Sequence, residues 1–308
     1  MRILITGGAG YFGTVLTSRL LAAGHEVTVF DDLRHGGSAL LPFFEHASFR
    51  FARGDVREQG SVREAVRWAD AVVHLAAIVG YPACLKWPEL ARETNVGGTR
   101  NVVAALSPRQ VLIYASSGSN YGKLETTCTE ESPLQPISLY AMTKAEAEEV
   151  ALAHPQATAL RFATGFGVSP RLRMDLLIND FVYRAVMDKQ LVVYERHFRR
   201  TFIHVRDMAR SVIFALEHLE AMAGRAFNVG HESLNLTKEE IARAVRAHVP
   251  FYLHFSDEGH DLDARDYEVS YERIRGLGFE TEVTLDEGIR ELIRVVQVID
   301  RATPYSNV

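Results

Sequence analysis

Residues 1–13, MRILITGGAGYFG, decide the fold of this chain. The apolar run at 3–5 predicts a buried strand, and the glycines Gly7, Gly10 and Gly13 follow it. The next residues, TVLTSRLLAA, have the spacing of an amphipathic helix, which Gly24 ends. A strand, a glycine-rich turn and a helix in this order are typical of the first half of a dinucleotide-binding βαβ unit.

Each of the three glycines has a physical task in such a unit. Gly7 permits a tight turn, and Gly10 lets the backbone approach a pyrophosphate at the positive end of the helix. Gly13 lets the helix pack closely on the strand. The stretch therefore predicts a dinucleotide cofactor bound where the first strand ends.

Composition limits the class of protein. Hydrophobic residues make up 47% and charged residues 24% of the 308 residues, which is usual for a globular enzyme. The 34 basic and 39 acidic residues give a net charge of −5, so no overall charge attracts nucleic acid or an anionic membrane. No apolar run has the length of a membrane span. With only Cys84 and Cys128 we expect no disulfide framework, which favours a cytoplasmic protein.

The second strand indicates which dinucleotide is bound. Residues 26–30, EVTVF, read as a strand that leads directly into Asp31 and Asp32. Asp31 lies 18 residues after the last of the three glycines, close to where an acidic residue receives the adenosine ribose hydroxyls. A carboxylate there repels a 2′-phosphate and favours NAD over NADP. Two alternatives stay open, because the acidic residues could cap a turn and because Arg34 and His35 could accommodate NADP.

Strands and helices alternate along the next part of the chain, which predicts a parallel sheet. After GDV at 54–56, Ser61 and Glu64 have the spacing of a helix capping box. Residues 71–75, AVVHL, read as a buried strand in which His74 is a structural histidine. The loop after this strand leaves the sheet at its carboxyl edge, so it should touch both cofactor and substrate.

A helix that begins at Pro88 carries the adjacent glycines Gly97 and Gly98. Glycine weakens a helix, so the two glycines predict close packing against another element. The strand QVLIYAS follows and leads into Ser116 and Ser117. A loop of about twenty residues comes next, and loops of that length in a compact domain are usually functional.

The helix after this loop, SLYAMTKAEAEEVALAHP, brings the chemistry. Tyr140 and Lys144 lie four residues apart and therefore on one face. A lysine ammonium beside a phenol favours the phenolate and lowers the pKa of the tyrosine, which lets it act as a base near neutral pH. Such pairs also occur on solvated helices. Here the pair follows the glycine-rich turn and Ser117 in order.

Taken in this order, the motifs resemble those of the extended short-chain dehydrogenase/reductases, and among them the NAD-dependent nucleotide-sugar epimerases and dehydratases. The resemblance covers nearly the whole chain. It rests on TGGAGYFG (6–13), FDD (30–32), GDV (54–56), HLAA (74–77), ETNVGGT (93–99), YASSGSNYG (114–122), YAMTK (140–144), LRFATGFG (160–167) and RRTFIHVRDMA (199–209).

The resemblance implies a role for each matching residue. Ser117 would hydrogen-bond the reacting sugar oxygen, Tyr140 would act as acid and base, and Lys144 would bind the nicotinamide ribose and tune Tyr140. Arg200 and Arg265 would bind the nucleotide diphosphate, although a solvated charge is the alternative for each. Asn95 would hold the backbone near the site. The full cofactor set would be Gly7, Gly10, Tyr11, Phe12, Gly13, Asp31, Asp32, Asp55, Val56, Leu75, Ala76, Ala77, Asn95, Tyr140 and Lys144.

Three departures from the family narrow the reaction. Related 4,6-dehydratases carry an Asp-Glu pair after the catalytic hydroxyl residue, whereas this chain has Gly118 and Ser119, so dehydration is not expected. Reductase/epimerases that also act at C3 and C5 carry a cysteine near the serine, and Cys84 lies in a different loop. Many UDP-hexose 4-epimerases place an asparagine at the diphosphate where this chain has Thr164, our further candidate for substrate binding, which puts UDP-glucose and UDP-galactose in doubt.

The last third of the chain carries weaker signals. Arg171 and Arg173 are candidates for phosphate contact, with a solvated loop as the alternative. Two spacings predict capping boxes of helices in a smaller lobe, and no His or Tyr near 251–260 has the spacing of a metal site, so we expect no metal. The capping boxes are Thr237 with Glu240 and Thr284 with Glu287.

The predicted fold is α/β, a Rossmann-type doubly wound parallel sheet with a smaller C-terminal α/β substrate-binding lobe. We expect residues 1–164, with 200–226 returning, to form the NAD-binding domain, and 165–199 with 227–308 to form the lobe.

The predicted function is an NAD-dependent epimerase of a nucleotide-diphosphate sugar, acting at C4 through a transient 4-keto intermediate. The alternatives are an NAD(P)H-dependent reductase or dehydrogenase of a nucleotide-linked keto-sugar and a catalytically silent NAD-responsive binding protein. We expect a homodimer packed through the helices at 89–106 and 138–153, with neither nucleic acid nor membrane as a partner.

Overall fold

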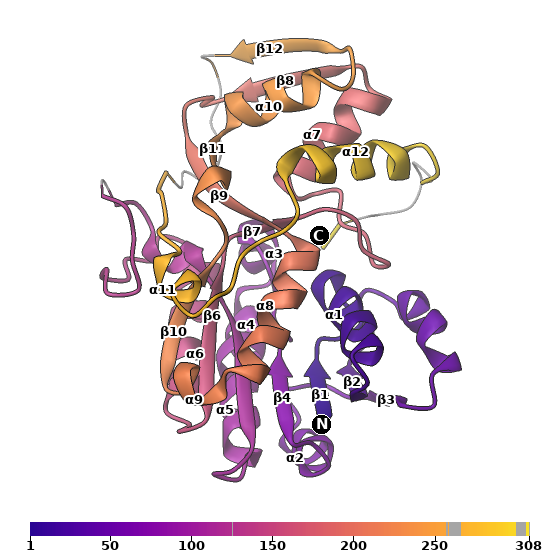
Figure 1. Ribbon diagram of the computed structural model, residues 1–308, viewed down its shortest axis with the longest axis vertical. Coiled ribbons are helices and arrows are strands. Elements are labelled where there is room, and N and C mark those ends of the chain that lie inside the picture. The colour runs from indigo at the N-terminus through magenta and orange to yellow at the C-terminus, as the bar shows by residue number, and fades with distance from the viewer. Residues whose placement is uncertain (125, 257, 259–265, 300–305, 308) are drawn as a thin grey trace.

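A parallel sheet forms the centre of the molecule. The computed structural model describes residues 1–124, 126–256, 258, 266–299, 306 and 307 (Figure 1). Within these residues, seven parallel strands pair in the order β10–β6–β5–β4–β1–β2–β3, so the chain reverses its direction of travel beside β1. This order is that of a doubly wound Rossmann-type sheet, and it confirms the predicted fold class. The strands are β1 (Arg2–Thr6), β2 (Glu26–Asp31), β3 (Phe49–Arg53), β4 (Ala71–His74), β5 (Val111–Ser117), β6 (Ala157–Phe162) and β10 (Arg225–Val229).

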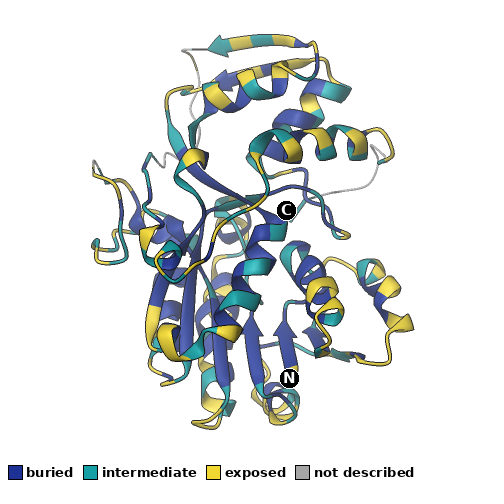
Figure 2. Cartoon of the chain, in the orientation of Figure 1, coloured by how far each residue is buried: buried dark blue, intermediate teal, exposed yellow. Residues whose placement is uncertain are grey.

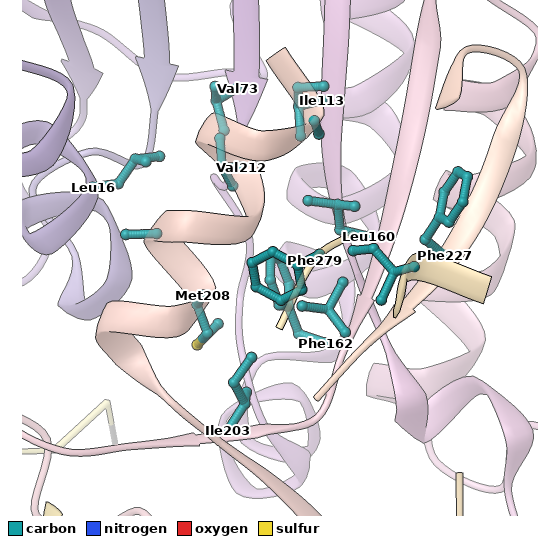
Figure 3. Close-up of a cluster of buried hydrophobic side chains, with 14 of the residues drawn as sticks. Leu16, Val73, Ile113, Leu160, Phe162, Ile203, Met208, Val212, Phe227 and Phe279 are labelled. Carbon is teal, nitrogen blue, oxygen red and sulfur yellow. The ribbon is translucent and has the colours of Figure 1, made fainter. Parts of the chain in front are cut away.

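Helices cover both faces of this sheet, which is why its inner strands are buried along most of their length (Figure 2). Alternate residues of β1 face opposite sides: Ile3 and Ile5 belong to one hydrophobic cluster and Leu4 to another. The first cluster packs α1 (Tyr11–Ala22) and α8 (Val205–Glu217) on the sheet (Figure 3). The second packs α2 (Gln59–Arg67), α5 (Gly98–Ala105) and α6 (Leu139–Leu152).

The smaller part of the molecule lies at the carboxyl ends of the parallel strands (Figure 1). The described residues form a three-stranded sheet in the order β11–β9–β7 and a strand pair, β12 with β8. Three helices pack with these strands around a separate hydrophobic cluster. The elements are β7 (Thr164–Phe166), β8 (Gln190–Tyr194), β9 (Arg199–His204), β11 (Asn235–Thr237), β12 (Tyr252–Ser256), α7 (Leu177–Met187), α10 (Lys238–Arg246) and α12 (Leu285–Val296).

How the chain is divided between the two parts stays a prediction. The segment 200–226 contains most of β9, which pairs with β7 in the small sheet, and the start of β10, which closes one edge of the large sheet. Among the helices that the described residues form, none is long and apolar enough to cross a membrane. Short helices complete the chain: η1 (Ser38–Glu45), α3 (Tyr81–Lys86), η3 (Gly118–Tyr121), α9 (Leu219–Met222), η4 (Glu232–Leu234) and α11 (Glu272–Arg275).

Two of the three predicted capping boxes are confirmed. Thr237 and Thr284 each accept a hydrogen bond from the backbone N–H of the glutamate three residues later, and each glutamate returns one to the threonine N–H. The prediction for Ser61 is wrong, because α2 begins two residues earlier, after Glu58, and Ser61 lies inside its first turn. The turn at Asp55, whose carbonyl accepts the N–H of Glu58, starts the helix before the serine is reached.

His74 is a structural histidine, as predicted. Its Nδ1 lies 2.6 Å from Thr6 Oγ1, and its Nε2 lies 3.0 Å from Thr99 Oγ1. Burial lowers the pKa of His74 to about 3, so the ring is neutral at physiological pH. The imidazole therefore links strands β1 and β4 of the sheet to helix α5.

The predicted helix from Pro88 is confirmed, and it has a π-helical segment at its centre. It runs as α4 (Pro88–Arg92), the π segment η2 (Glu93–Gly97) and then α5. A Cβ on Gly98 would lie 2.6 Å from Val56 Cγ2, which confirms close packing there. A Cβ on Gly97 would meet no atom of the described chain within 4 Å. Packing inside the molecule thus explains Gly98 but not Gly97.

We expect Gly98→Ala to destabilise the protein by about 1–3 kcal/mol, because valine is stiff and Val56 cannot retreat from the added methyl group. Gly60→Ala in α2 is the matched control, since an added Cβ there meets no described atom within 4 Å. It should leave the stability unchanged or raise it by up to about 1 kcal/mol. Urea unfolding midpoints of the two variants measure the difference, and equal midpoints would contradict the packing argument.

Candidate active site

A cleft with a volume of about 320 Å³ opens at the carboxyl ends of the central strands. Ligands of doubly wound folds bind at this edge, beside the point where the strand order reverses. The cleft brings together, from seven separate segments, 16 of the catalytic, cofactor-binding and substrate-binding residues that the sequence nominated. They are Gly7, Gly10, Tyr11, Phe12, Gly13, Asp31, Asp32, Asp55, Val56, Leu75, Ala76, Ala77, Ser117, Tyr140, Lys144 and Thr164.

The glycine-rich turn has the shape of a pyrophosphate cradle. Gly7 adopts φ +71°, and a Cβ on it would lie 2.7 Å from the backbone of Ala76. A Cβ on Gly13 would lie 2.5 Å from the Cα of Gly8. No side chain caps the first turn of α1, whose N–H groups and dipole favour a bound anion. The residues present therefore fit a dinucleotide.

Carboxylates lie where the adenosine ribose is expected. Asp31 accepts hydrogen bonds from the N–H groups of Ala9, at 3.0 Å, and Leu33, at 2.8 Å, so its side chain is held in one position. Burial raises the pKa of Asp31, and the two backbone hydrogen bonds oppose that rise. Asp32 pairs with Arg34 at 2.9 Å. A carboxylate fixed at the end of β2 suits ribose hydroxyls, which donate hydrogen bonds to it.

Asn95 does not line the cleft, but it joins two segments that do. Its Oδ1 accepts the N–H of Ile78 at 2.7 Å, and its Nδ2 donates to the carbonyl of Ile78 at 3.1 Å and to Thr143 Oγ1 at 2.9 Å. The amide thus fastens the loop after β4 to helix α6, which carries Tyr140 and Lys144.

The serine, tyrosine and lysine that the sequence singled out line one end of this cleft. Ser117 ends β5, and its Oγ accepts the N–H of Ser119 at 3.1 Å and donates to Ser119 Oγ at 3.0 Å. Tyr140 and Lys144 lie on α6, whose N-cap Ser138 accepts the N–H of Ala141 at 3.2 Å. A hydroxyl, a phenol and an ammonium in one water-poor pocket can transfer a proton to or from an alcohol.

Lys144 is buried to an unusual degree for a lysine. Only 4% of it is exposed, and its Nζ lies 4.2 Å from the centre of the Tyr114 ring. Burial lowers the pKa of Lys144 to about 7, and the nearby Glu148 carboxylate opposes this shift. The charge of the lysine therefore changes near neutral pH.

A buried ion pair, which sequence reasoning missed, lies beside the candidate catalytic residues. Arg161 donates from Nη2 to Glu148 Oε1 at 2.6 Å, and both side chains are almost fully buried. Ser116 Oγ also donates to Glu148, and Asn120 Nδ2 donates to Ser116 Oγ at 3.1 Å. The pair thus joins α6 and β6 to the loop that follows Ser117. Two signals were available, since Glu148 lies one turn after Lys144 and Arg161 interrupts an apolar strand.

The structure describes one of the two arginines nominated for the diphosphate, and that arginine does not line the cleft. Arg200 lies on β9 opposite Leu236 with its side chain buried, and it is not among the residues that line the cleft. Arg265 lies outside the described residues. Of the two weaker candidates, Arg173 lines the cleft and Arg171 does not. Among the described residues, no group of three or more His, Cys, Asp or Glu side chains could hold a metal ion.

Comparison with known proteins identifies the family of the chain. The family model described as the NAD dependent epimerase/dehydratase family matches residues 3–230. A dTDP-glucose 4,6-dehydratase from Streptomyces niveus is 31% identical, over 95% of this chain and 92% of its own length. A UDP-glucose 4-epimerase from Corynebacterium glutamicum is 27% identical, over 80% of this chain and 81% of its own. The structure of the Thermus thermophilus UDP-glucose 4-epimerase with NAD has a TM-score of 0.81 at 25% identity, covering 97% of this chain and 99% of that one.

The chain belongs to the NAD-dependent epimerase/dehydratase family, within the extended short-chain dehydrogenase/reductases. NAD is its cofactor, and the turn at Gly7–Gly13 with Asp31 is where the chain would hold it. The named relatives catalyse different reactions, so membership defines the class of enzyme and the cofactor.

The buried lysine makes stability depend on pH in a defined window. The pKa of Lys144 falls from 10.5 to about 7 on folding, so the unfolded chain binds more protons between these values and stability rises with pH there. Relative to Lys144→Met, the wild-type protein should gain up to about 1.4 kcal/mol per pH unit between pH 7 and pH 10. Urea unfolding of both cofactor-free proteins at pH 7.5 and 9.0 measures this gain. A constant difference between them would show that Lys144 is not titrating.

Proposed function

We propose that the protein is an NAD-dependent epimerase of a nucleotide-diphosphate sugar, acting at C4 through a transient 4-keto intermediate. The observation that carries the proposal is the convergence of Ser117, Tyr140 and Lys144 in the cleft that also contains the glycine-rich turn. The nucleotide-sugar class is supported by the substrates in the names of the relatives.

In this proposal the side chains transfer protons, and the bound cofactor would carry the hydride. NAD, when bound, supplies a reversible hydride acceptor. Tyr140, as phenolate, accepts the proton of the C4 hydroxyl, and Ser117 donates a hydrogen bond to the same oxygen. The Lys144 ammonium stabilises the phenolate and binds the nicotinamide ribose. After the keto sugar has turned over in the pocket, its C4 would be reduced from the opposite face, and Tyr140 returns the proton to the oxygen.

The acidic residues of the cleft argue against dehydration. Loss of water from C5 and C6 needs an acid and a base beside the sugar. The carboxylates that line the described part of the cleft are Asp31, Asp32 and Asp55, which follow β2 and β3 at the adenosine end. At the catalytic end, Gly118 and Ser119 follow Ser117. The site therefore suits hydride and proton transfer at one carbon better than elimination.

We further propose a homodimer through the helices at 89–106 and 138–153. Gly97 supports it, because a Cβ there would meet no atom of the described chain, as would be the case where a second helix packs. Met142 on α6 and the nearby Ile137 and Leu85 also expose large apolar side chains. Light scattering of the protein in solution tests the assembly.

Nuclear magnetic resonance in D₂O separates the proposed reaction from its alternatives. With catalytic NAD and a panel of UDP-, dTDP-, GDP- and CDP-sugars, we expect a C4 isomer without deuterium at C5 and without net change in nicotinamide absorbance. A keto sugar carrying deuterium at C5 would indicate a dehydratase. Stoichiometric formation or loss of NADH would indicate a dehydrogenase or reductase. No product from any sugar would favour a binding protein.

Removing one oxygen tests the role of the phenol. Tyr140→Phe should lower turnover by about 10²–10⁴-fold, because general acid–base catalysis contributes that much. Its affinity for NAD should change little, since the pyrophosphate cradle is untouched. Tyr183→Phe on α7, outside the residues that line the cleft, is the control and should retain full activity. Equal activity of both variants would remove Tyr140 from the mechanism.

A further inference from the structure

The segment between β7 and α7 lies against the first turn of α1 (Figure 1). Ser169 Oγ donates to the carbonyl of Tyr11 at 2.6 Å and lies 3.0 Å from Thr14 Oγ1. In return, Tyr11 Oη donates to the carbonyl of Gly167 at 2.8 Å. These bonds hold a loop of the smaller part of the molecule beside the helix N-terminus where the cofactor pyrophosphate is expected.

Two further bonds give this loop a fixed shape. Asn179 Nδ2 donates to the carbonyl of Arg173 at 2.7 Å, and Asn179 Oδ1 accepts the N–H of Gly167 at 3.0 Å. Asn179 is fully buried, so these bonds are shielded from water. Asn179 of α7 therefore fixes the position of the Arg173 backbone.

Arg173 combines burial with a place in the lining of the cleft. The residue is only 9% exposed, yet it lines the cleft together with the glycine-rich turn. Its Nε and Nη2 donate to Asp175 at 3.0 and 2.6 Å. Its Nη1 has no hydrogen-bond partner among the described residues. A planar group held on one edge by a carboxylate keeps its other edge available for phosphate oxygens.

Nearby charges show at which end of the cleft Arg173 lies. Burial lowers the pKa of His35 to about 4, and the positive charges of Arg171, Arg34 and Arg173 contribute to this shift. Burial raises the pKa of the phenol of Tyr11, the first residue of α1, and the positive charge of Arg173 opposes that rise. The carboxylates on this side belong to Asp31 and Asp32 and to Asp175, the partner of Arg173. Together with the bonds between this loop and Tyr11, these neighbours place the segment that carries Arg173 near both the expected adenosine pocket and the N-terminus of α1.

We propose that Arg173 binds the pyrophosphate of NAD from the side opposite α1. The cofactor would then be held between two parts of the chain, by backbone N–H groups of α1 on one side and by a guanidinium from the loop before α7 on the other. Such a clamp suits an enzyme that keeps its cofactor through each cycle. The proposal depends on NAD binding and is independent of which sugar reacts.

A sugar nucleotide also carries a pyrophosphate, so the ligand chemistry alone does not name the source. The bonds from the loop to Tyr11 and the effect of Arg173 on His35 favour the cofactor, because Tyr11 begins α1, where its pyrophosphate is expected, and His35 follows Asp31 and Asp32 at its expected adenosine end. A purely structural ion pair with Asp175 is the competing explanation. Binding measurements with fragments of the two ligands separate these three possibilities.

The first experiment compares Arg173→Gln with Arg171→Gln. Arg171 is the matched control, because it lies two residues away and donates to the carbonyl of Ser306 at 2.8 Å without lining the cleft. In equilibrium titrations, Arg173→Gln should raise the Kd of NAD and of ADP by about 10–100-fold and leave that of adenosine unchanged. Arg171→Gln should change none of them by more than about 3-fold. An unchanged Kd of ADP, or equal losses for ADP and adenosine, would overturn the proposal.

The second experiment separates the two pyrophosphates. With NAD saturating, UDP and dTDP should bind wild type and Arg173→Gln alike. A loss confined to UDP or dTDP would assign the residue to the sugar nucleotide and overturn the proposal.

Arg173→Lys keeps the positive charge but loses the planar pairing with phosphate oxygens. It is therefore a second variant that tests the proposal even where Arg173→Gln does not fold. We expect Arg173→Lys to weaken ADP binding, but less than Arg173→Gln, and unweakened ADP binding in a folded lysine variant would count against the clamp. Because these assays measure binding without turnover, their failure would leave the proposed epimerase reaction to its own test.

Discussion

The close approach of the glycine-rich turn after β1 to the loop after β4 is the constraint on which the rest of the structure depends. Gly7 lies so near the backbone of Ala76 that no side chain fits between them, and Gly13 lies equally close to Gly8. This contact sets the N-terminus of α1 beside the loop after β4. The helix dipole and the carboxyl ends of the strands therefore face a single cleft, which is where a doubly wound sheet can bind a dinucleotide.

Buried polar groups then place the reactive side chains on this frame. The ion pair of Glu148 and Arg161 holds α6, β6 and the loop after β5 together, and Asn95 joins the loop after β4 to the same helix. Buried charges of this kind contribute little net stability, but they penalise any arrangement that separates them. The position of Lys144 next to Glu148 shows a second consequence, because the carboxylate supports a charge that burial disfavours.

Fold and cofactor leave the reaction open in this family, because the named relatives catalyse different reactions. In this chain the positions after Ser117 hold Gly118 and Ser119, and the carboxylates of the described cleft cluster at the adenosine end. Around Ser117, Tyr140 and Lys144, the proposed catalytic residues, the lining thus supplies hydroxyl and amino groups. This distribution of charge, more than the overall likeness to dehydratases or epimerases, is the reason to favour proton and hydride transfer at one carbon.

The sequence by itself determined what depends on near neighbours: the strand, turn and helix at the start of the chain, the capping boxes at Thr237 and Thr284, and the shared helical face of Tyr140 and Lys144. It also indicated which strand ends would meet, because parallel strands expose their carboxyl ends at one edge. Only the tertiary structure decided that Arg173 lines the cleft, that α2 begins before Ser61, and that Glu148 pairs with Arg161. The cleft position of Arg173 and the pairing of Glu148 with Arg161 depend on packing between separate segments, because the sequence marks each charged residue but not its partner. The start of α2 depends on the turn at Asp55, which the spacing of Ser61 and Glu64 did not indicate.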